Sequence, residues 1–385
     1  MLNSRTPLRS KLPTTGVSIF ATMSRLALEH NAINLSQGFP DFDCAPELVD
    51  TVERYMREGH NQYAPMPGVP ALREALAFKI ERLYGRRYDP ATEITVTSGA
   101  TEALFATLTA LVHPGDEVLL FQPAYDSYVP AIQLSGGTPT FVTLRPPNYG
   151  IDWDEVRRAI TPRTRAIVIN SPHNPTGMIL GADDIRELAR VLEHTDAVVV
   201  ADEAYEHIVF DGARHESLSR HAAVAERAVV IGSFGKTFHT TGWKIGWAVA
   251  PKALTAEVQS IHQWVTFAVN GAIQLAYAEF IRKDPECRSV GVFYQRKRDL
   301  FLSLIAGSRF QPLPCRGTFF QMADYSAITS ERDADFAMRL LTEHGVASIP
   351  PSSFLYGVEP GPILRFCFAK RDETLERAAE RLRKV

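Results

Sequence analysis

A lysine ends a short apolar run within VVIGSFGKTFHTTGWKIGW, residues 229–247. Lys236 follows Ser-Phe-Gly, and Lys244 comes eight residues later, before another apolar run. Most lysines simply face solvent. A lysine held at the end of a strand can instead capture a carbonyl group as a nucleophile. The Gly-Lys-Thr here is not part of a phosphate-binding P-loop, because that motif needs a glycine five positions before Gly235, where the chain has Val230.

Small residues follow the predicted strand 94–97. Ser98, Gly99, Ala100 and Thr101 lead into a helical pattern. The free backbone N–H groups and the dipole at such a helix start suit one phosphate group. An ordinary helix start capped by Ser98 or Thr101 explains the same residues equally well.

Three further strand ends carry an aromatic, an amide and an acidic side chain. Tyr125 follows one strand, Asn174 lies in the loop SPHNPTG after the next, and Asp202 directly follows the apolar run 197–201. Taken singly, a core tyrosine, a plain turn and a helix cap explain these residues. A carboxylate in the position of Asp202 should nevertheless be largely buried, and it then needs a cationic or hydrogen-bonding partner.

The surrounding sequence predicts the elements that position these side chains. Short runs rich in valine and isoleucine predict seven strands, at 94–97, 117–121, 138–144, 165–170, 197–201, 228–233 and 245–250. Helical patterns lie between them, at about 101–112, 152–160 and 183–194. This alternation predicts an α/β fold with a mostly parallel sheet covered on both faces.

The last two predicted strands are joined by a short connection. Residues 234–244 show no helical pattern and are too few for a parallel crossover, so the last strand is expected to run antiparallel. That direction returns Lys244 to the edge of the sheet where Lys236 leaves it. A long helical pattern follows at about 253–283.

Ligands of open parallel α/β sheets bind outside the carboxyl ends of the strands. The strand ends of this chain together offer an anion site, an aromatic ring, an amide, a buried acid and a lysine. A ligand that uses all of them carries one phosphate, a flat ring, a basic ring nitrogen and a carbonyl group. Pyridoxal 5′-phosphate (PLP) has these features.

The chain resembles the class I, fold-type I PLP-dependent aminotransferases over nearly its whole length. The motifs that carry the resemblance stand in the order of the family: NQYAPMPGVPALREAL, TSGATEAL, PAYDSY, SPHNPTG, ADEAYEHI, SFGKTFHTTGWKIGW and LRFCFAK. Within the family it is most similar to the bacterial methionine aminotransferases and next to the kynurenine/glutamine transaminase K group. The resemblance implies a transaminase with a seven-stranded sheet in a large domain and a smaller α+β domain.

The resemblance also implies a role for each matching residue. Lys236 would hold PLP covalently and transfer a proton, Asp202 would pair with the ring nitrogen, and Tyr125 would stack on the ring. Arg365 would bind the substrate carboxylate near the backbone of Gly38. The ring oxygen would be bound by Asn174 and Tyr205. The phosphate would be surrounded by Ser98, Gly99, Ala100, Thr101, Ser233 and Lys244, and by Tyr63 of the partner subunit.

Two sequence features bear on the substrate. Many class I members have arginine where this chain has Lys244, and a lysine still neutralises a phosphate. In the aspartate branch, an arginine from the neighbouring subunit holds a second substrate carboxylate, but the stretch 258–274 here contains no arginine or lysine. We therefore expect neutral donors: methionine, aromatic amino acids, kynurenine or glutamine. A cysteine-S-conjugate β-lyase on the same scaffold is the alternative.

Aromatic residues offer an apolar side-chain pocket, although core packing explains each of them equally well. They are Phe20, Phe267 and Phe354, with Trp264 beside them.

Composition sets the remaining expectations. The 385 residues have a net charge of −3, which does not suggest a nucleic-acid or membrane surface. The four cysteines form no disulfide or metal-binding spacing, so we expect no metal and a cytoplasmic protein.

The basic start is compatible with a transit peptide, but we expect an N-terminal arm over 1–37 that packs with a small domain, 276–385, beside a large domain, 38–275. The resemblance implies a homodimer with active sites at the interface.

Overall fold

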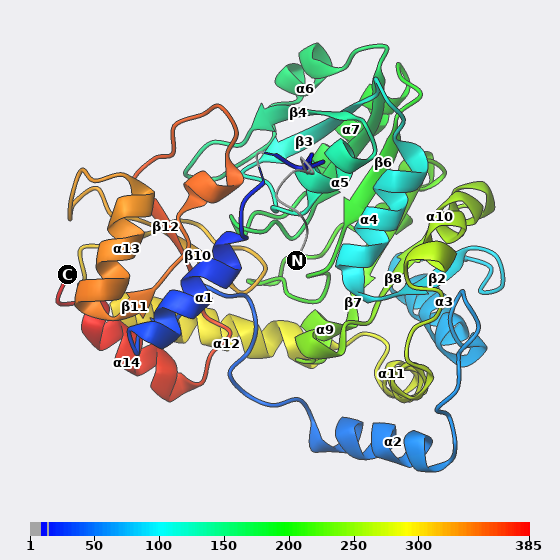
Figure 1. Cartoon of the computed structure of the whole chain (residues 1–385), viewed down its shortest axis with the longest axis horizontal. Helices are drawn as coiled ribbons and strands as arrows, with labels where there is room; N and C mark the ends of the chain where they lie inside the picture. Colours follow the sequence, from blue (N-terminus) through cyan, green and yellow to red (C-terminus); the bar gives the residue numbers. More distant parts are fainter. Residues whose placement is uncertain (1–8, 14) are drawn as a thin grey trace, which may run out of the picture.

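The computed structural model describes residues 9–13 and 15–385. Residues 1–8 and 14 of the predicted N-terminal arm lie outside the described part. Figure 1 shows a layered α/β part, in cyan to green, beside a second group of elements that joins the blue start of the chain to its orange and red end.

The large sheet has seven strands, as the sequence predicts. They are β2 (Ile94–Thr97), β3 (Glu117–Gln122), β4 (Thr138–Thr143), β5 (Thr164–Asn170), β6 (Val198–Asp202), β7 (Ala228–Ser233) and β8 (Gly246–Val249). Their order is β2-β8-β7-β6-β5-β3-β4. β8 runs antiparallel to both of its neighbours, which confirms the prediction made from its short connection, and the other strand pairs are parallel.

The strands read as continuous apolar runs because both faces of the sheet are covered. Successive residues point to opposite faces. Leu119 and Val199 lie in the core on one face, whereas Leu120 and Val200 lie in the core on the other. The first face is covered by α2 (Pro46–Arg57), α3 (Pro70–Tyr84), α6 (Trp153–Ala159), α7 (Ala182–Leu192), α8 (Ala222–Ala225) and α11 (Gly271–Lys283). The second is covered by α4 (Gly99–Leu111), α5 (Tyr128–Leu134) and α10 (Lys252–Val265).

The remaining elements build a second core and a smaller cluster around short sheets. They are α1 (Ile19–Glu29), β1 (Ile33–Asn34), α12 (Arg288–Ile305), β9 (Gln311–Pro312), β10 (Phe320–Asp324), α13 (Asp333–His344), β11 (Val346–Ala347), β12 (Ile363–Cys367) and α14 (Asp372–Leu382). β12, β10 and β9 form an antiparallel sheet, and β1 pairs with β11. The 3₁₀ turns of the chain are η1 (Leu218–Arg220), η2 (Thr241–Trp243) and η3 (Pro351–Phe354).

The start of the chain packs against its C-terminal part. Met23 and Ala27 of α1 are buried in one cluster with Leu341 and Ile349. The division into 1–37, 38–275 and 276–385 stays a prediction, and its second boundary falls within α11. This helix contacts α2 and α3, which cover the large sheet.

Two expectations about local structure are wrong. The helical pattern at 253–283 is two helices, because Phe267 takes a left-handed φ of 67° and the Asn270 side chain caps the start of α11. The connection 234–244 does contain helical turns, α9 (Phe234–Thr237) and η2. They are too short to leave a periodic pattern in the sequence.

Candidate active site

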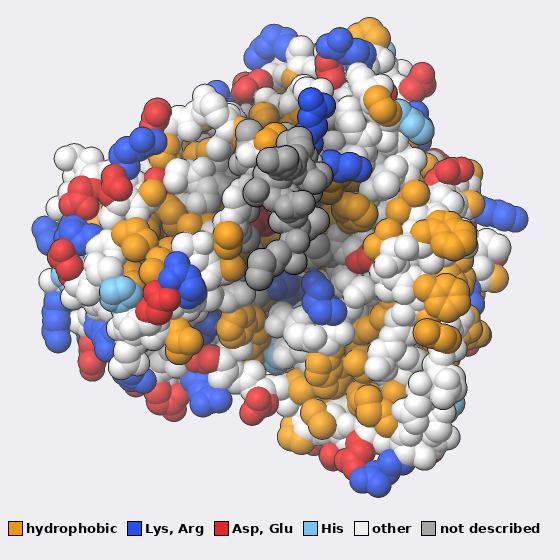
Figure 2. Space-filling view, in the orientation of Figure 1, with side chains coloured by type: hydrophobic (Ala, Val, Ile, Leu, Met, Phe, Trp, Pro, Cys, Tyr) orange, Lys and Arg blue, Asp and Glu red, His pale blue; other side chains and the backbone are white. Residues whose placement is uncertain are grey.

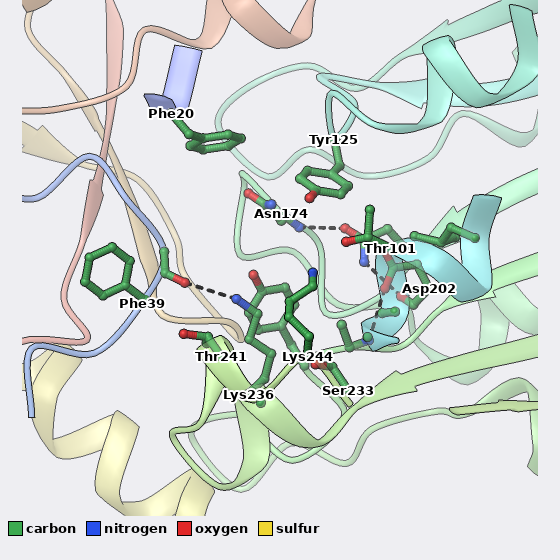
Figure 3. Close-up of a pocket in the computed structure, with 18 of the residues that line it drawn as sticks. Phe20, Phe39, Thr101, Tyr125, Asn174, Asp202, Ser233, Lys236, Thr241 and Lys244 are labelled. Carbon is green, nitrogen blue, oxygen red and sulfur yellow. Dashed lines mark hydrogen bonds between the residues drawn. The ribbon is translucent and has the colours of Figure 1, made fainter. Parts of the chain in front are cut away.

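A cavity of about 340 Å³ opens at the carboxyl ends of β5, β6 and β7, beside the start of α4. Most of the residues that the sequence singles out line it together, as Figure 3 shows for those it labels. They are Phe20, Gly38, Gly99, Ala100, Thr101, Tyr125, Asn174, Asp202, Tyr205, Ser233, Lys236 and Lys244. Strand ends that are far apart in the sequence therefore meet at one site.

Lys236 lies on α9, which directly follows β7. Its Nζ donates a hydrogen bond to the carbonyl oxygen of Gly38 at 3.0 Å (Figure 3). No carboxylate of the described residues lies within ion-pair distance of the amine. Removal from bulk water, together with the nearby charges of Lys244 and Arg365, lowers the pKa of Lys236 to about 8. A sizeable share of this amine is therefore neutral near physiological pH.

Asp202 is the last residue of β6, and its carboxylate is buried. Oδ2 accepts a hydrogen bond from the Tyr128 hydroxyl at 2.7 Å, and Oδ1 accepts one from the backbone N–H of Ala204 at 3.1 Å. Burial raises the pKa of Asp202, while the two hydrogen bonds favour the charged form. Asp202 is thus an interior acid with a fixed orientation, aimed at the cavity.

The turn after β2 is built for close approach of a ligand. Gly99 has a φ of 75°, and a Cβ added there would lie 3.3 Å from the Lys244 Nζ. Lys244 itself takes a left-handed conformation that brings its ammonium group to the start of α4. Ser98 does not line the cavity, and its side chain makes no capping hydrogen bond to α4; its backbone N–H donates to the Glu102 side chain at 3.0 Å. Backbone N–H groups and one lysine therefore converge here, as an anion requires.

The loop SPHNPTG is held by a chain of hydrogen bonds that starts on β5. Asn170 Oδ1 accepts from the backbone N–H of Asn174 at 2.8 Å, and Asn170 Nδ2 donates to the carbonyl oxygen of Asp202 at 2.8 Å. Asn174 thus has a fixed place on one side of the cavity. The rings of Phe20 and Tyr125 lie near each other across the mouth, 6.5 Å apart between their centroids (Figure 3).

Arg365, on β12, is fully buried behind the cavity wall rather than on its surface. Its guanidinium donates to Asn174 Oδ1 at 2.8 Å and to the carbonyl oxygen of Ser36 at 2.7 Å, and its Nε has no partner. The group lies 3.9 Å from the ring centroid of Phe320 and 5.2 Å from that of Phe20. Burial lowers the pKa of Arg365 to about 10. No carboxylate of the described chain pairs with this interior cation.

Besides Ser98 and Arg365, four predicted aromatic residues do not line the cavity of this chain. Phe354 is buried behind Phe20, 5.8 Å away between ring centroids. Tyr63 and Phe267 form an edge-to-face pair, and their side chains are 85% and 51% exposed. Trp264 of α10 is exposed as well. Figure 2 shows hydrophobic side chains gathered on this face around α10.

Sequence reasoning missed several residues of the site. Asn170 ends β5 and follows the same strand-end rule that identified Asp202, so the rule, applied fully, finds it. Tyr128 lies in the quoted motif PAYDSY, but no local pattern pairs it with Asp202. Gln37, Phe39 and Phe320 line the cavity from elements far away in the sequence, which no strand-end rule reaches. The described residues hold no cluster of three or more side chains suited to a metal ion.

Comparisons with known proteins agree with this geometry. Residues 30–382 match the family model for aminotransferase class I and II. The chain is 48% identical to the methionine aminotransferase of Escherichia coli K12, over 98% of each chain. It is 33% identical to human kynurenine–oxoglutarate transaminase 1, over 94% of each chain.

A solved structure is also similar. The crystal structure of YbdL from Escherichia coli, described as having a methionine aminotransferase function, superposes with a TM-score of 0.96. It has 48% sequence identity, and the match covers 99% of this chain and 100% of that one. The seven-stranded sheet, the lysine at the strand end and these matches lead to one conclusion: the chain belongs to the class I and II aminotransferases.

Proposed function

We propose that this aminotransferase uses PLP, bound covalently to Lys236, to move the α-amino group of a neutral amino acid to a 2-oxo acid. The observation that carries the proposal is the cavity itself. It combines a lysine amine of lowered pKa, an interior acid and an anion turn within one space. PLP is a ligand that requires all three groups.

The residues present fit PLP. A phosphate suits the start of α4, where the Gly99 backbone and the Lys244 ammonium group meet. A pyridine nitrogen suits Asp202, whose carboxylate is already fixed by Tyr128. The ring oxygen suits Asn174 and Tyr205, and the flat ring suits Tyr125. Ala100, Thr101 and Ser233 complete the proposed cofactor site.

Bound PLP supplies an electron sink for the charge that develops when a substrate loses its Cα proton. The chain supplies the proton transfer. The lowered pKa leaves the Lys236 amine partly neutral. The amine can therefore accept a proton from Cα of the substrate and return it to the neighbouring C4′ atom of the cofactor. Ionised Asp202 favours a protonated ring nitrogen, and its burial strengthens that interaction. Tyr125 and Asn174 restrict the orientation in which the substrate reacts.

Arg365 is the proposed binding group for the substrate carboxylate. A planar guanidinium binds a carboxylate through two parallel hydrogen bonds. Here the group is buried without an acidic partner, and neutral oxygens of Asn174 and Ser36 occupy its donors. A substrate carboxylate would compensate the interior charge better than these oxygens do. The Gly38 backbone lies next to this position, at the cavity wall.

A neutral substrate side chain is supported by the composition of the cavity. Phe20, Tyr125 and Phe320 line it, and its only cations are Lys236 and Lys244 among the described residues. Both are already assigned to the cofactor. The relatives named for methionine and kynurenine agree with this preference. We propose methionine, aromatic amino acids, kynurenine or glutamine as donors.

The proposed active unit is a homodimer in the cytoplasm. Tyr63 and Phe267 are exposed side by side, and Tyr63 of the partner subunit is the proposed phosphate contact. Phe267 would complete the side-chain pocket in the same way, with Phe354 supporting Phe20 from behind. All four cysteines are free, which agrees with a reducing compartment. No helix in the described part is both long and apolar enough to cross a bilayer.

A donor-by-acceptor activity matrix tests the proposal. Purified protein loaded with PLP is assayed with neutral, acidic and basic amino acids against several 2-oxo acids. Rapid transfer from methionine or an aromatic donor is expected, and it is lost in Lys236→Ala. Release of pyruvate and ammonia from a cysteine conjugate without a 2-oxo acid would instead identify a β-lyase. Activity that survives in Lys236→Ala would contradict the assignment of this lysine.

A further inference from the structure

One short segment, residues 36–41, lies across the cavity and is here called the strap. Gln37, Gly38 and Phe39 of the strap line the cavity. The strap follows β1 and Leu35, whose backbone is hydrogen-bonded to Ala347 and Cys367. Its other end is fixed through Asp41, which accepts hydrogen bonds from Arg371 and Thr374. The strap thus closes part of the site while both of its ends are held by the C-terminal elements.

Three cations hold three carbonyl oxygens of the strap. Arg365 donates to Ser36 at 2.7 Å, and Lys236 donates to Gly38 at 3.0 Å. Lys370 donates to Phe39 at 2.9 Å. The first two cations have other partners under the proposed function, because Lys236 binds the cofactor and Arg365 binds the substrate. Only the bond from Lys370 can persist unchanged through turnover.

Lys370 has no other evident use for its charge. Its side chain is 2% exposed, and no carboxylate of the described residues lies within ion-pair distance of it. The ammonium group lies 4.7 Å from the ring centroid of Phe39, so one strap residue binds it through both its carbonyl oxygen and its ring. Lys370 does not line the cavity. Burying an ammonium group with a single carbonyl oxygen as its hydrogen-bond partner costs free energy. Such a cost suggests that the contact with the strap serves the function of the protein.

We propose that Lys370 is a positioning residue that keeps the strap closed against the cavity, so that Gln37, Gly38 and Phe39 are in place when the substrate binds. The inference rests on the proposed function, since the strap borders the proposed substrate site. Without the Lys370 bond, Gln37 keeps its hydrogen bonds to Asn34 and Ser24, but the Gly38–Phe39 part of the strap is left with the bond from Lys236, which turnover engages elsewhere. It then occupies its closed position for a smaller fraction of the time.

This role predicts a particular kinetic signature. Apparent affinity falls in proportion to the fraction of protein that is ready to bind, whereas the reaction of bound substrate depends on Lys236 and Asp202. Loss of one hydrogen bond to a charged group corresponds to about a tenfold change in an equilibrium. In Lys370→Met, the KM for the amino donor is expected to rise by up to about tenfold, while kcat stays within about twofold of the original value.

The experiment compares the PLP-loaded wild type with Lys370→Met, Lys370→Arg and Lys283→Met. Lys370→Arg keeps a buried cation and should recover most of the lost affinity. Lys283 is the control, because it also lies over an aromatic ring, 5.5 Å from the centroid of Phe280, but is exposed and has no hydrogen bond to the strap. Its replacement should leave KM unchanged. Thermal unfolding of each variant shows whether the fold is retained.

Hydrogen exchange supplies a readout that needs no activity. Peptides covering residues 36–41 should exchange faster in Lys370→Met, while peptides covering β6 keep their original rate. An unchanged KM together with unchanged strap exchange would overturn the inference. A rise in KM accompanied by equally large losses of kcat and thermal stability would also overturn the inference, because it would indicate a purely structural residue. If the wild type itself transfers no amino group, the proposed function fails, and the exchange result still judges the strap.

Discussion

Lys236 and Arg365 are both removed from bulk water without a carboxylate partner among the described residues. Folding gains little from such an arrangement, because a buried charge is stable only when its partners replace water. A structural role would be better served by an acidic neighbour. The two cations therefore indicate sites that a ligand completes, and the ligand is expected to carry a carbonyl group and a carboxylate.

The lowered pKa of Lys236 makes cofactor capture depend on pH. Only the neutral amine attacks a carbonyl, and its pKa of about 8 lies well below the ordinary value for lysine. The rate at which cofactor-free protein captures PLP should rise as pH increases to about 8 and level off above it. Stopped-flow absorbance over a pH series measures this. A rate that keeps rising towards pH 10 would show that the site does not lower the pKa.

Asp202 and Tyr128 should affect catalysis to different degrees. Asp202→Asn removes the negative charge with almost no change of shape, so kcat is expected to fall at least about 100-fold. Tyr128→Phe leaves the charge and removes one hydrogen bond, so a fall of about tenfold is expected. Steady-state kinetics and thermal unfolding measure both effects. If Tyr128→Phe were as damaging as Asp202→Asn, the hydroxyl would have a role beyond orienting the carboxylate.

At the scale of elements, β8 joins the two halves of the site. It lies between β2, which leads into the anion turn, and β7, which leads into Lys236. Gly246 begins this strand in close contact with the turn, because a Cβ added there would lie 2.6 Å from the backbone N of Ala100. The glycine is required by this approach of two backbones rather than by an unusual φ.

Gly246→Ala should therefore push the strand and the turn apart. We expect a loss of about 1–3 kcal/mol in the free energy of unfolding, with weaker PLP binding, because the clash is with backbone atoms that cannot rotate away. Gly242→Ala is the control, since a Cβ at that position meets nothing within 4 Å. Its stability should stay within about 0.5 kcal/mol of the original. Equal denaturation midpoints for the two variants would contradict the close contact.

The sequence predicts the large sheet well because every one of its strands is a buried apolar run with a recognisable end. It predicts the C-terminal part poorly. β1 pairs with β11, and β10 pairs with β12, across long stretches of chain, and none of these pairings leaves a local pattern. The same limit applies to the site. Asp202 is identified by its own strand, whereas Phe320 and the strap reach the cavity only through tertiary packing.

At the scale of the whole molecule, the exposed aromatic residues beside α10 favour an interface. Large contiguous apolar patches are uncommon on monomers. Tyr63 and Phe267 lie outside the cavity of their own chain although the resemblance to the family implies a role at an active site. Both facts agree if two chains associate so that each supplies these side chains to the other.

Mixed dimers test this arrangement. Tyr63→Ala and Lys236→Ala should each be almost inactive alone. Any weak residual activity of Tyr63→Ala is subtracted as background. If Tyr63 acts in the other subunit, each mixed dimer contains one intact site, and an equal mixture should recover about a quarter of wild-type activity. Unfolding and refolding the two chains together, followed by assay, measures the recovery. No recovery from a refolded, dimeric mixture would place Tyr63 in its own subunit's site.

The order of strands in the large sheet also has a consequence for how the protein is made. β2 emerges early from the ribosome, but within the described part of the chain it pairs only with β8, the last of the seven strands to be synthesised. Until that strand arrives, the nascent polypeptide has no means of bringing the start of α4 beside Lys244. A ribosome stalled before Gly246 is synthesised therefore carries a chain in which the proposed PLP site is not yet assembled.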